Sequence, residues 1–168
     1  MSTHLDISQI LDFAIHMEQK GYEFYTESAK KFNDLKLTQL FHLLAEQEFN
    51  HERVFKKMKE ETSSQGSTAL DDKVEGMHMK DYLGDFIFGK KKSLKEKVKT
   101  LQTIDEVIHL AFGIEKDSVV FYSAMKNYVD KEHEAMIENV IQEEVSHVLR
   151  LQKFKTEEIP PPPDVDAL

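Results

Sequence analysis

Apolar residues recur every three to four positions along four long stretches of the chain, at about residues 7–32, 37–61, 104–129 and 132–157. This spacing, held over so many positions, is typical of amphipathic α-helices that bury one face. Thr103 and Glu106 have the spacing of a capping box, which predicts the start of the third helix. Short turns separate the first helix from the second and the third from the fourth, so each pair is predicted to form an antiparallel hairpin.

The segment that joins the two hairpins, at about residues 62–102, is longer than an up-down-up-down bundle needs. A four-helix bundle with one long crossover is the ferritin-like arrangement, and this all-α fold is the prediction. Within the crossover, TSSQGS is interpreted as a loop, KDYLGDFIF as a short helix or apolar plug, and GKKKSLKEKVK as a solvated basic piece. Because four prolines follow the last helix, we predict one helical domain over residues 1–158 and an extended tail over 159–168.

Each predicted helix carries one glutamate in the middle of its apolar face: Glu18, Glu48, Glu115 and Glu144. Two histidines, His51 and His147, follow the second and fourth glutamates by three positions and share their faces. The two glutamates of a hairpin are about equally far from its turn, which predicts that all of these charges meet in one layer. Unpaired carboxylates in an apolar core are very costly, and no Lys or Arg lies near them on these faces. Bound cations are therefore the best explanation.

The two hairpins are also similar to each other in sequence. AIHMEQKGYEFYTESAK aligns with AFGIEKDSVVFYSAMKN at an offset of 97 residues, and EFNH aligns with EVSH at an offset of 96. The alignment pairs the glutamates, the histidines, and also Tyr25 with Tyr122. The Glu-x-x-His pattern alone is weak evidence, because it also begins at Glu75 and at Glu106, where surface residues are the simpler interpretation. Its repetition on two matched apolar faces is the stronger indication of a metal site.

Carboxylates and imidazoles together are a hard, oxygen-rich donor set, which suits iron or manganese better than a structural zinc. We predict that the layer binds two such ions, iron or manganese, with zinc as a substitute. Tyr25 and Tyr122 lie two turns beyond a glutamate on the same face. They are interpreted either as aromatic core or as catalytic residues that donate hydrogen bonds to the carboxylates or pass electrons or protons. Tyr22 and Glu52 are weaker candidates for that second role. His133 is interpreted as a surface or helix-end residue.

MEQKGYEFY, EFNH, IEKDSVVFY and EEVSH resemble the four helix motifs of the rubrerythrin branch of the ferritin-like superfamily. The resemblance covers nearly all of the chain outside the crossover and the tail. It implies a non-haem di-iron centre with these ligands: Glu18, Glu48, His51, Glu115, Glu144 and His147. It also implies an oxidoreductase, usually one that reduces hydrogen peroxide or oxygen in protection against oxidative stress, and a homodimer or larger assembly.

Two features depart from the family pattern. Rubrerythrins proper hold a rubredoxin-type iron centre with four cysteines, whereas this chain has no cysteine, so electrons are expected from an external donor such as a rubredoxin-type protein. Ser118 stands where the family has a further glutamate, one turn after the third-helix ligand. The remaining ligands match the symmetric set of ferritin-type ferroxidase sites. Iron oxidation for sequestration therefore stays open, as does a non-catalytic, metal-stabilised interaction protein.

Composition narrows the partners and the compartment. A net charge of −9 argues against a nucleic acid or an anionic membrane as partner. No apolar run is long enough for a membrane span, and no apolar segment follows a basic start, so the cytoplasm is expected. The absence of cysteine excludes disulfides, thiol nucleophiles and iron–sulfur centres in these 168 residues. The expected partners are thus a small-molecule oxidant, an electron donor and a second copy of the chain.

Overall fold

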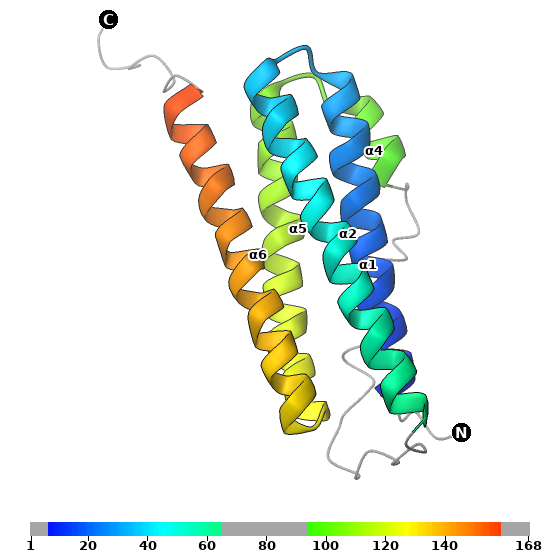
Figure 1. Ribbon diagram of the computed structural model, residues 1–168. Coiled ribbons are helices and arrows are strands. Elements are labelled where there is room, and N and C mark those ends of the chain that lie inside the picture. Colours follow the sequence, from blue (N-terminus) through cyan, green and yellow to red (C-terminus); the bar gives the residue numbers. More distant parts are fainter. Residues whose placement is uncertain (1–6, 65–93, 159–168) are drawn as a thin grey trace, which may run out of the picture.

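The computed structural model describes residues 7–64 and 94–158, and over these residues it contains helices and turns alone (Figure 1). The long helices are α1 (Ile7–Lys31), α2 (Leu35–Ser64), α5 (Ile104–Met125) and α6 (Lys131–Glu158). A short helix, α4 (Leu94–Thr100), precedes α5, and a 3-10 turn (Lys126–Tyr128) follows it. The all-α prediction is confirmed, and the ends of the long helices lie within a few residues of those predicted.

The bundle is built from two antiparallel hairpins, α1 with α2 and α5 with α6 (Figure 1). In addition, α2 packs against α6 and α1 against α5, so the long helices enclose one common core. The end of α2 and the start of α5 lie at opposite ends of the bundle (Figure 1). The two helices therefore run in the same direction, which a short loop cannot connect, and this is the predicted ferritin-like topology.

Side chains at the helix starts explain where three of the long helices begin. Asp34 accepts a hydrogen bond at 2.8 Å from a backbone N–H in the first turn of α2. Thr103 and Glu106 form the predicted capping box at the start of α5. Asp130 accepts hydrogen bonds at 3.0 and 2.9 Å from two backbone N–H groups in the first turn of α6. These side chains satisfy N–H groups that have no partner within the helix itself.

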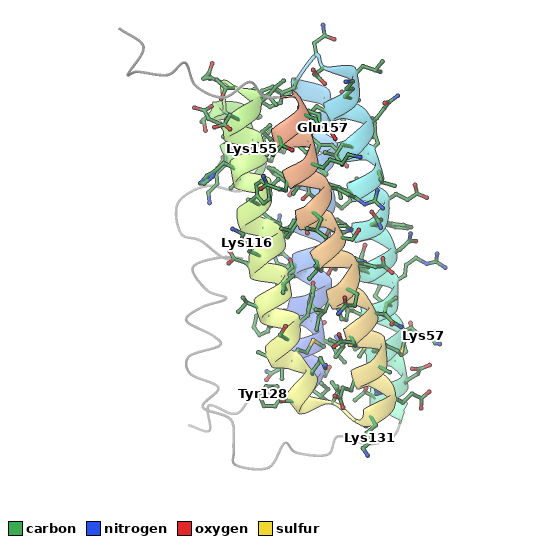
Figure 2. The ribbon with its side chains drawn as sticks, turned by 90° about the vertical axis from the view of Figure 1, so that its left-hand side faces the viewer. Lys57, Lys116, Tyr128, Lys131, Lys155 and Glu157 are labelled. Atoms are coloured by element: carbon green, nitrogen blue, oxygen red, sulfur yellow. The ribbon has the colours of Figure 1, made fainter. Side chains whose placement is uncertain are left out.

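Two apolar clusters fill the bundle, one on each side of the glutamate positions. The first includes Leu11 of α1 and Met125 of α5, and the second includes Phe41 of α2 and Leu151 of α6. All of these side chains are fully buried. Figure 2 shows side chains filling the space between the helices, while Lys57 projects outward from α2. On each long helix the glutamate stands between residues of the two clusters, so apolar side chains cover the charged layer on both sides.

The basic segment before α5 differs from its prediction as a solvated piece. Residues 94–100 form helix α4, which packs against α1 and buries Val98 at 2 % exposure. The Nζ atom of Lys31, in the last turn of α1, donates hydrogen bonds to the backbone carbonyls of Val98 at 2.9 Å, of Lys99 at 2.7 Å and of Leu101. The lysine therefore caps the negative end of the α4 helix dipole, which the hydrophobic pattern could not reveal.

Three other expectations have mixed outcomes. The predicted loop TSSQGS begins within α2, which continues to Ser64. His133 does stand at a helix start, but it is buried at 6 % exposure, and its Nδ1 lies 2.8 Å from a carboxylate oxygen of Asp130. KDYLGDFIF, Glu75 and the tail over 159–168 lie outside the described residues. Within the described ranges, no helix is both long and apolar enough to cross a membrane.

Candidate metal centre

The buried layer predicted from the sequence brings together six side chains: Glu18, Glu48, His51, Glu115, Glu144 and His147. None of them is more than 2 % exposed. Each long helix contributes one glutamate, and α2 and α6 each contribute a histidine three residues later, on the same helix face. Glu106, which begins another Glu-x-x-His pattern, is exposed and forms part of the capping box of α5, as predicted.

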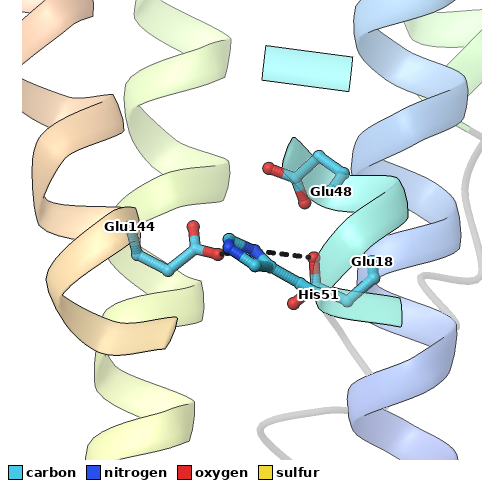
Figure 3. A group of neighbouring side chains, drawn as sticks. All are labelled: Glu18, Glu48, His51 and Glu144. Atoms are coloured by element: carbon cyan, nitrogen blue, oxygen red, sulfur yellow. Dashed lines mark ion pairs between the residues drawn. The ribbon is translucent and has the colours of Figure 1, made fainter. Parts of the chain in front are cut away.

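Donor atoms of these side chains form two overlapping groups, in each of which the atoms lie within 4.8 Å of one another. The first group is Glu18, Glu48, His51 and Glu144, and the second is Glu48, Glu115, Glu144 and His147. Figure 3 shows the first group, with the ring of His51 between Glu18 and Glu144. Because Glu48 and Glu144 belong to both groups, they would contribute to both metal positions, while Glu18 with His51 and Glu115 with His147 would each contribute to one.

Several polar atoms of the layer are buried without a hydrogen-bond partner. They include Oε2 of Glu18, Oε1 of Glu48 and both carboxylate oxygens of Glu144. Nδ1 of His51 lies 2.8 Å from Oε1 of Glu144, yet the two atoms do not form a hydrogen bond. Leaving such a group unsatisfied costs about 1–3 kcal/mol. The donor set therefore fits divalent cations of the iron and manganese type better than it fits a self-contained polar network.

Burial raises the pKa of three of the carboxyl groups, because the charged form loses its hydration. The pKa of Glu115 rises to about 8, and the pKa values of Glu18 and Glu48 also lie above the ordinary value. Glu144 differs from the others. Burial disfavours its charged form as well, but the rings of His51 and His147, whose Nδ1 atoms lie 2.8 and 3.5 Å from its oxygens, outweigh burial and lower its pKa. Glu144 is thus the carboxylate that keeps its charge most readily.

The two histidines complete the charge balance of the layer. Burial alone lowers the pKa of His51, but its contacts with Glu144 and Glu18 raise that pKa to about 11. The pKa of His147 is likewise lowered by burial and raised more strongly by neighbouring carboxylates. Without a metal, imidazolium groups therefore partly neutralise the carboxylates. Divalent cations can take over this role, and they release the protons as they bind.

Two tyrosine hydroxyl groups hold Glu18 and Glu115, the two glutamates that each take part in one donor group alone. Tyr25 of α1 donates to Oε1 of Glu115 on α5, and Tyr122 of α5 donates to Oε1 of Glu18 on α1. Burial, followed by the nearby carboxylates, raises the pKa of both hydroxyls well above the ordinary value, so both remain protonated donors. Each glutamate is left with Oε2 turned toward the histidines. Of the two interpretations from the sequence, these contacts favour hydrogen bonding to the carboxylates.

Gly21 is a functional position that the sequence reasoning missed. A Cβ atom at this position would lie 2.5 Å from Oε2 of Glu48 and 2.9 Å from its Cδ, so any side chain there would displace that carboxylate. The available signal was a glycine inside an amphipathic helix, which costs about 1 kcal/mol relative to alanine and so suggests a packing reason. At an offset of 97 residues its counterpart is Ser118, which is buried at 5 % exposure.

The weaker candidates lie apart from the layer. Tyr22 is 44 % exposed and packs against Phe49, with 6.2 Å between the ring centroids, so its predicted role was wrong. Glu52 is buried at 8 % exposure, but its Oε1 accepts a hydrogen bond from Gln19 at 2.8 Å and pairs with Lys56 at 2.6 Å. These partners occupy Glu52 outside both donor groups.

Comparisons with known proteins agree with this geometry. The sequence profile of the Rubrerythrin family matches residues 9–155. A crystal structure from Thermotoga maritima, described as a ferritin-like diiron-carboxylate protein, is similar to this chain with a TM-score of 0.70 and 26 % sequence identity. The similarity covers 94 % of this chain and 99 % of that one. A search of curated proteins gave no match. On the family match and the buried donor groups together, this cysteine-free chain belongs to the Rubrerythrin family.

Proposed function

We propose that this protein is a non-haem di-iron oxidoreductase that reduces hydrogen peroxide or oxygen with electrons from an external donor. The observation that carries the proposal is the pair of overlapping donor groups that share Glu48 and Glu144. Two adjacent ferrous ions supply two electrons together, which matches reduction of hydrogen peroxide with two protons to two water molecules. A rubredoxin-type protein is the class of donor that would return the electrons. Iron as the physiological metal is part of the proposal, and manganese or zinc could substitute for it.

The residues of the chain prepare the site for this chemistry. The apolar clusters on both sides of the layer keep bulk water away from the reacting atoms. Tyr25 and Tyr122 hold protons at Oε1 of Glu115 and of Glu18, so proton donors stand beside the charged layer. Because Glu48 and Glu144 belong to both donor groups, they would hold both ions when these are bound. These roles need no cysteine, in keeping with an external electron donor.

A ferroxidase that oxidises iron for sequestration is the second candidate, and Ser118 favours it. In rubrerythrins this position holds a further glutamate, whereas here the two donor groups are completed by the same residue types on both sides. Such a symmetric set resembles a ferroxidase site. Assembly size separates the two candidates, because a shell-like multimer suits storage and a dimer suits peroxide reduction. Sedimentation of the iron-loaded protein measures this directly.

The decisive experiment loads the metal-free protein with ferrous iron under anaerobic conditions and then mixes it rapidly with hydrogen peroxide or with oxygen. The rise of ferric absorbance gives the rate of each reaction. Faster oxidation by peroxide supports the peroxidase, and faster oxidation by oxygen supports the oxidase or ferroxidase. No response to either oxidant would leave a metal-stabilised interaction protein. Glu115→Ala is expected to lose at least about 10-fold in metal affinity, whereas Glu106→Ala, at the exposed cap, is expected to keep it.

A further inference from the structure

The outward-facing ring nitrogen of His51 has a carboxylate partner. Nδ1 of this ring faces Glu18 and Glu144, at 3.5 and 2.8 Å, whereas Nε2 lies 2.9 Å from Oε2 of Glu143. Glu143 stands on α6, directly before Glu144. If Nδ1 binds a metal ion, Nε2 carries the proton of the ring and donates a hydrogen bond to Glu143. A carboxylate in this position fixes the ring and makes the ligand nitrogen more basic.

The corresponding place in the other half of the bundle holds an amide. At an offset of 96 residues, the counterpart of Glu143 is Gln47, which stands on α2 directly before Glu48. Nδ1 of His147 lies 3.1 Å from Oε2 of Glu115, while Nε2 of the same ring is buried and has no hydrogen-bond partner. Oε1 of Gln47 is also buried and has none. An N–H donor and an amide acceptor are thus both unsatisfied in equivalent places.

Glu143 and Gln47 stand on α6 and α2, the same two helices that carry the histidines. The rings of His51 and His147 stack with 5.6 Å between their centroids and 20° between their planes. Their two helices also pack against each other. His51 of α2 pairs with Glu143 of α6. By the internal repeat, Gln47 of α2 takes the sequence position of Glu143, but it makes no hydrogen bond to His147 of α6.

We propose that Glu143 positions the ligand histidine His51, that the neutral Gln47 gives His147 no equivalent support, and that this difference makes the two metal positions unequal. At the position of Glu18 and His51, the histidine has a negatively charged partner, whereas at the position of Glu115 and His147 the outer ring nitrogen has no partner and the equivalent residue, Gln47, is neutral. A charged acceptor strengthens the imidazole as a ligand more than a neutral amide does. The first position therefore binds a divalent ion more tightly. This inference rests on the metal site of the proposed function and concerns the difference between its two halves.

The size of the difference follows from exposure. Removing an outer partner of a ligand histidine typically costs 10–100-fold in metal affinity. The side chain of Glu143 is 51 % exposed, so solvent screens its charge and the lower end of that range applies. We expect about a 10-fold ratio between the two stepwise affinities. The tighter step belongs to the side of His51.

The test is a stepwise titration of the metal-free protein with ferrous iron under anaerobic conditions, followed by Mössbauer spectroscopy at one and two equivalents. We expect two unequal steps, and one dominant ferrous signal at one equivalent. Glu143→Gln should bring the steps close to equality by weakening the tighter one about 10-fold. Gln47→Glu should bring them together by strengthening the weaker one. Glu46→Gln is the matched control, because it removes one negative charge from an exposed position of α2, and it should keep the unequal steps.

The outcomes separate this inference from the proposed function. Two equal steps in the unchanged protein would overturn the inference and leave the two-metal site in place. An unchanged ratio in both Glu143→Gln and Gln47→Glu would overturn it as well. Binding of fewer than two ions would instead overturn the proposed function together with the inference.

Discussion

At the scale of single residues, contacts in the charged layer leave particular atoms available for metal. Tyr122 engages Oε1 of Glu18, and the unpartnered Oε2 of the same glutamate faces Nδ1 of His51 at 3.5 Å. Tyr25 likewise engages Oε1 of Glu115 in the other half of the bundle, where Oε2 of Glu115 faces Nδ1 of His147 and is hydrogen-bonded to it at 3.1 Å. Each hydroxyl thereby selects which oxygen of its glutamate faces the centre. Substitutions that alter one oxygen at a time should therefore change metal binding without unfolding the bundle.

Gly21→Ala is expected to weaken metal binding at least about 10-fold. The new Cβ would lie 2.5 Å from Oε2 of Glu48, which is one of the two carboxylates shared by both donor groups. Competition with a chelator of known affinity measures the loss. Gly113→Ala is the control, because a Cβ there meets nothing within 4 Å, and it should keep the metal and gain up to about 1 kcal/mol of stability. Equal metal affinities in the two variants would contradict the role of Gly21.

Tyr25→Phe should weaken the metal position of Glu115, and Tyr122→Phe the position of Glu18. Each substitution leaves a buried carboxylate oxygen without its donor, which costs about 1–3 kcal/mol, or roughly 10-fold to 100-fold in affinity. Spectroscopy at one equivalent of ferrous iron reports which position fills first, so the two variants should shift occupancy in opposite directions. Tyr128→Phe, at the far end of the bundle, should behave as the unchanged protein. A shift in the same direction for both variants would argue against the crossed pairing.

At the scale of helices, α4 depends on α1 for its position. It has 7 residues, which is too short for a stable isolated helix, and it contributes one buried side chain, Val98. The three carbonyls bonded by Lys31 lie at its C-terminal end, where carbonyls lack partners within the helix, although that of Val98 also accepts a hydrogen bond from the backbone N–H of Leu101. The last turn of α1 therefore holds the segment that leads into α5.

Lys31→Met should release α4 from α1. Removing the charged donor takes one hydrogen bond from each of three carbonyls, of which only that of Val98 keeps another donor among the described residues, and we expect a loss of about 1–3 kcal/mol in the free energy of unfolding. Amide hydrogen exchange should accelerate in residues 94–100 more than in the long helices. Lys30→Met is the matched control, since Lys30 is 65 % exposed and pairs with Glu27 at the surface, where such a pair contributes little. Similar exchange in both variants would show that Lys31 does not hold α4.

The sequence predicted those features that repeat along a helix. Glu18 and Glu48 were found because an apolar stripe with one charged position has few explanations, and the long helices because their periodicity is strong. Helix α4 was missed because a short, lysine-rich segment with one buried valine has no detectable period. Tyr22 was placed wrongly because a helical wheel gives a direction from the axis and does not say where neighbouring helices end. Side-chain partners depend on the packing of helices, which the pattern of one helix does not contain.

At the scale of the whole molecule, the internal repeat makes the bundle two similar halves around one charged layer. Each hairpin supplies two glutamates and one histidine, and α2 and α6 bring the two histidines together across the contact between hairpins. The crossed bonds of Tyr25 and Tyr122 link α1 to α5 in the same way. Neither hairpin contains a complete donor group, since both groups draw on α2 and α6. Metal binding is therefore expected to stabilise the association of the hairpins as well as each site.

The metal-free protein should lose stability as the pH rises from about 6.5 to 8. Burial raises the pKa of Glu115 from 4.5 to about 8. As the pH rises toward 8, the unfolded carboxyl group is already ionised while the buried one resists ionisation, so this group opposes folding increasingly. Burial lowers the pKa of His51 but the facing carboxylates raise it from 6.5 to about 11, so its stabilising charge is complete below 6.5 and declines above that pH. In both cases the folded state binds more protons than the unfolded state, and such a state is destabilised by rising pH.

The expected slope is on the order of 1 kcal/mol per pH unit, because one additional bound proton corresponds to about 1.4 kcal/mol per unit. Urea unfolding in the presence of a chelator, at several values between pH 6.5 and 8, measures it. With two equivalents of manganese the slope should flatten or reverse, since divalent ions replace the same protons and bind more tightly as the pH rises. Glu115→Gln should reduce the slope in the chelator by removing one titrating group. A metal-free protein whose stability is constant or increases over this range would show that protons do not balance the charged layer, and the carboxylates would then need another source of compensation.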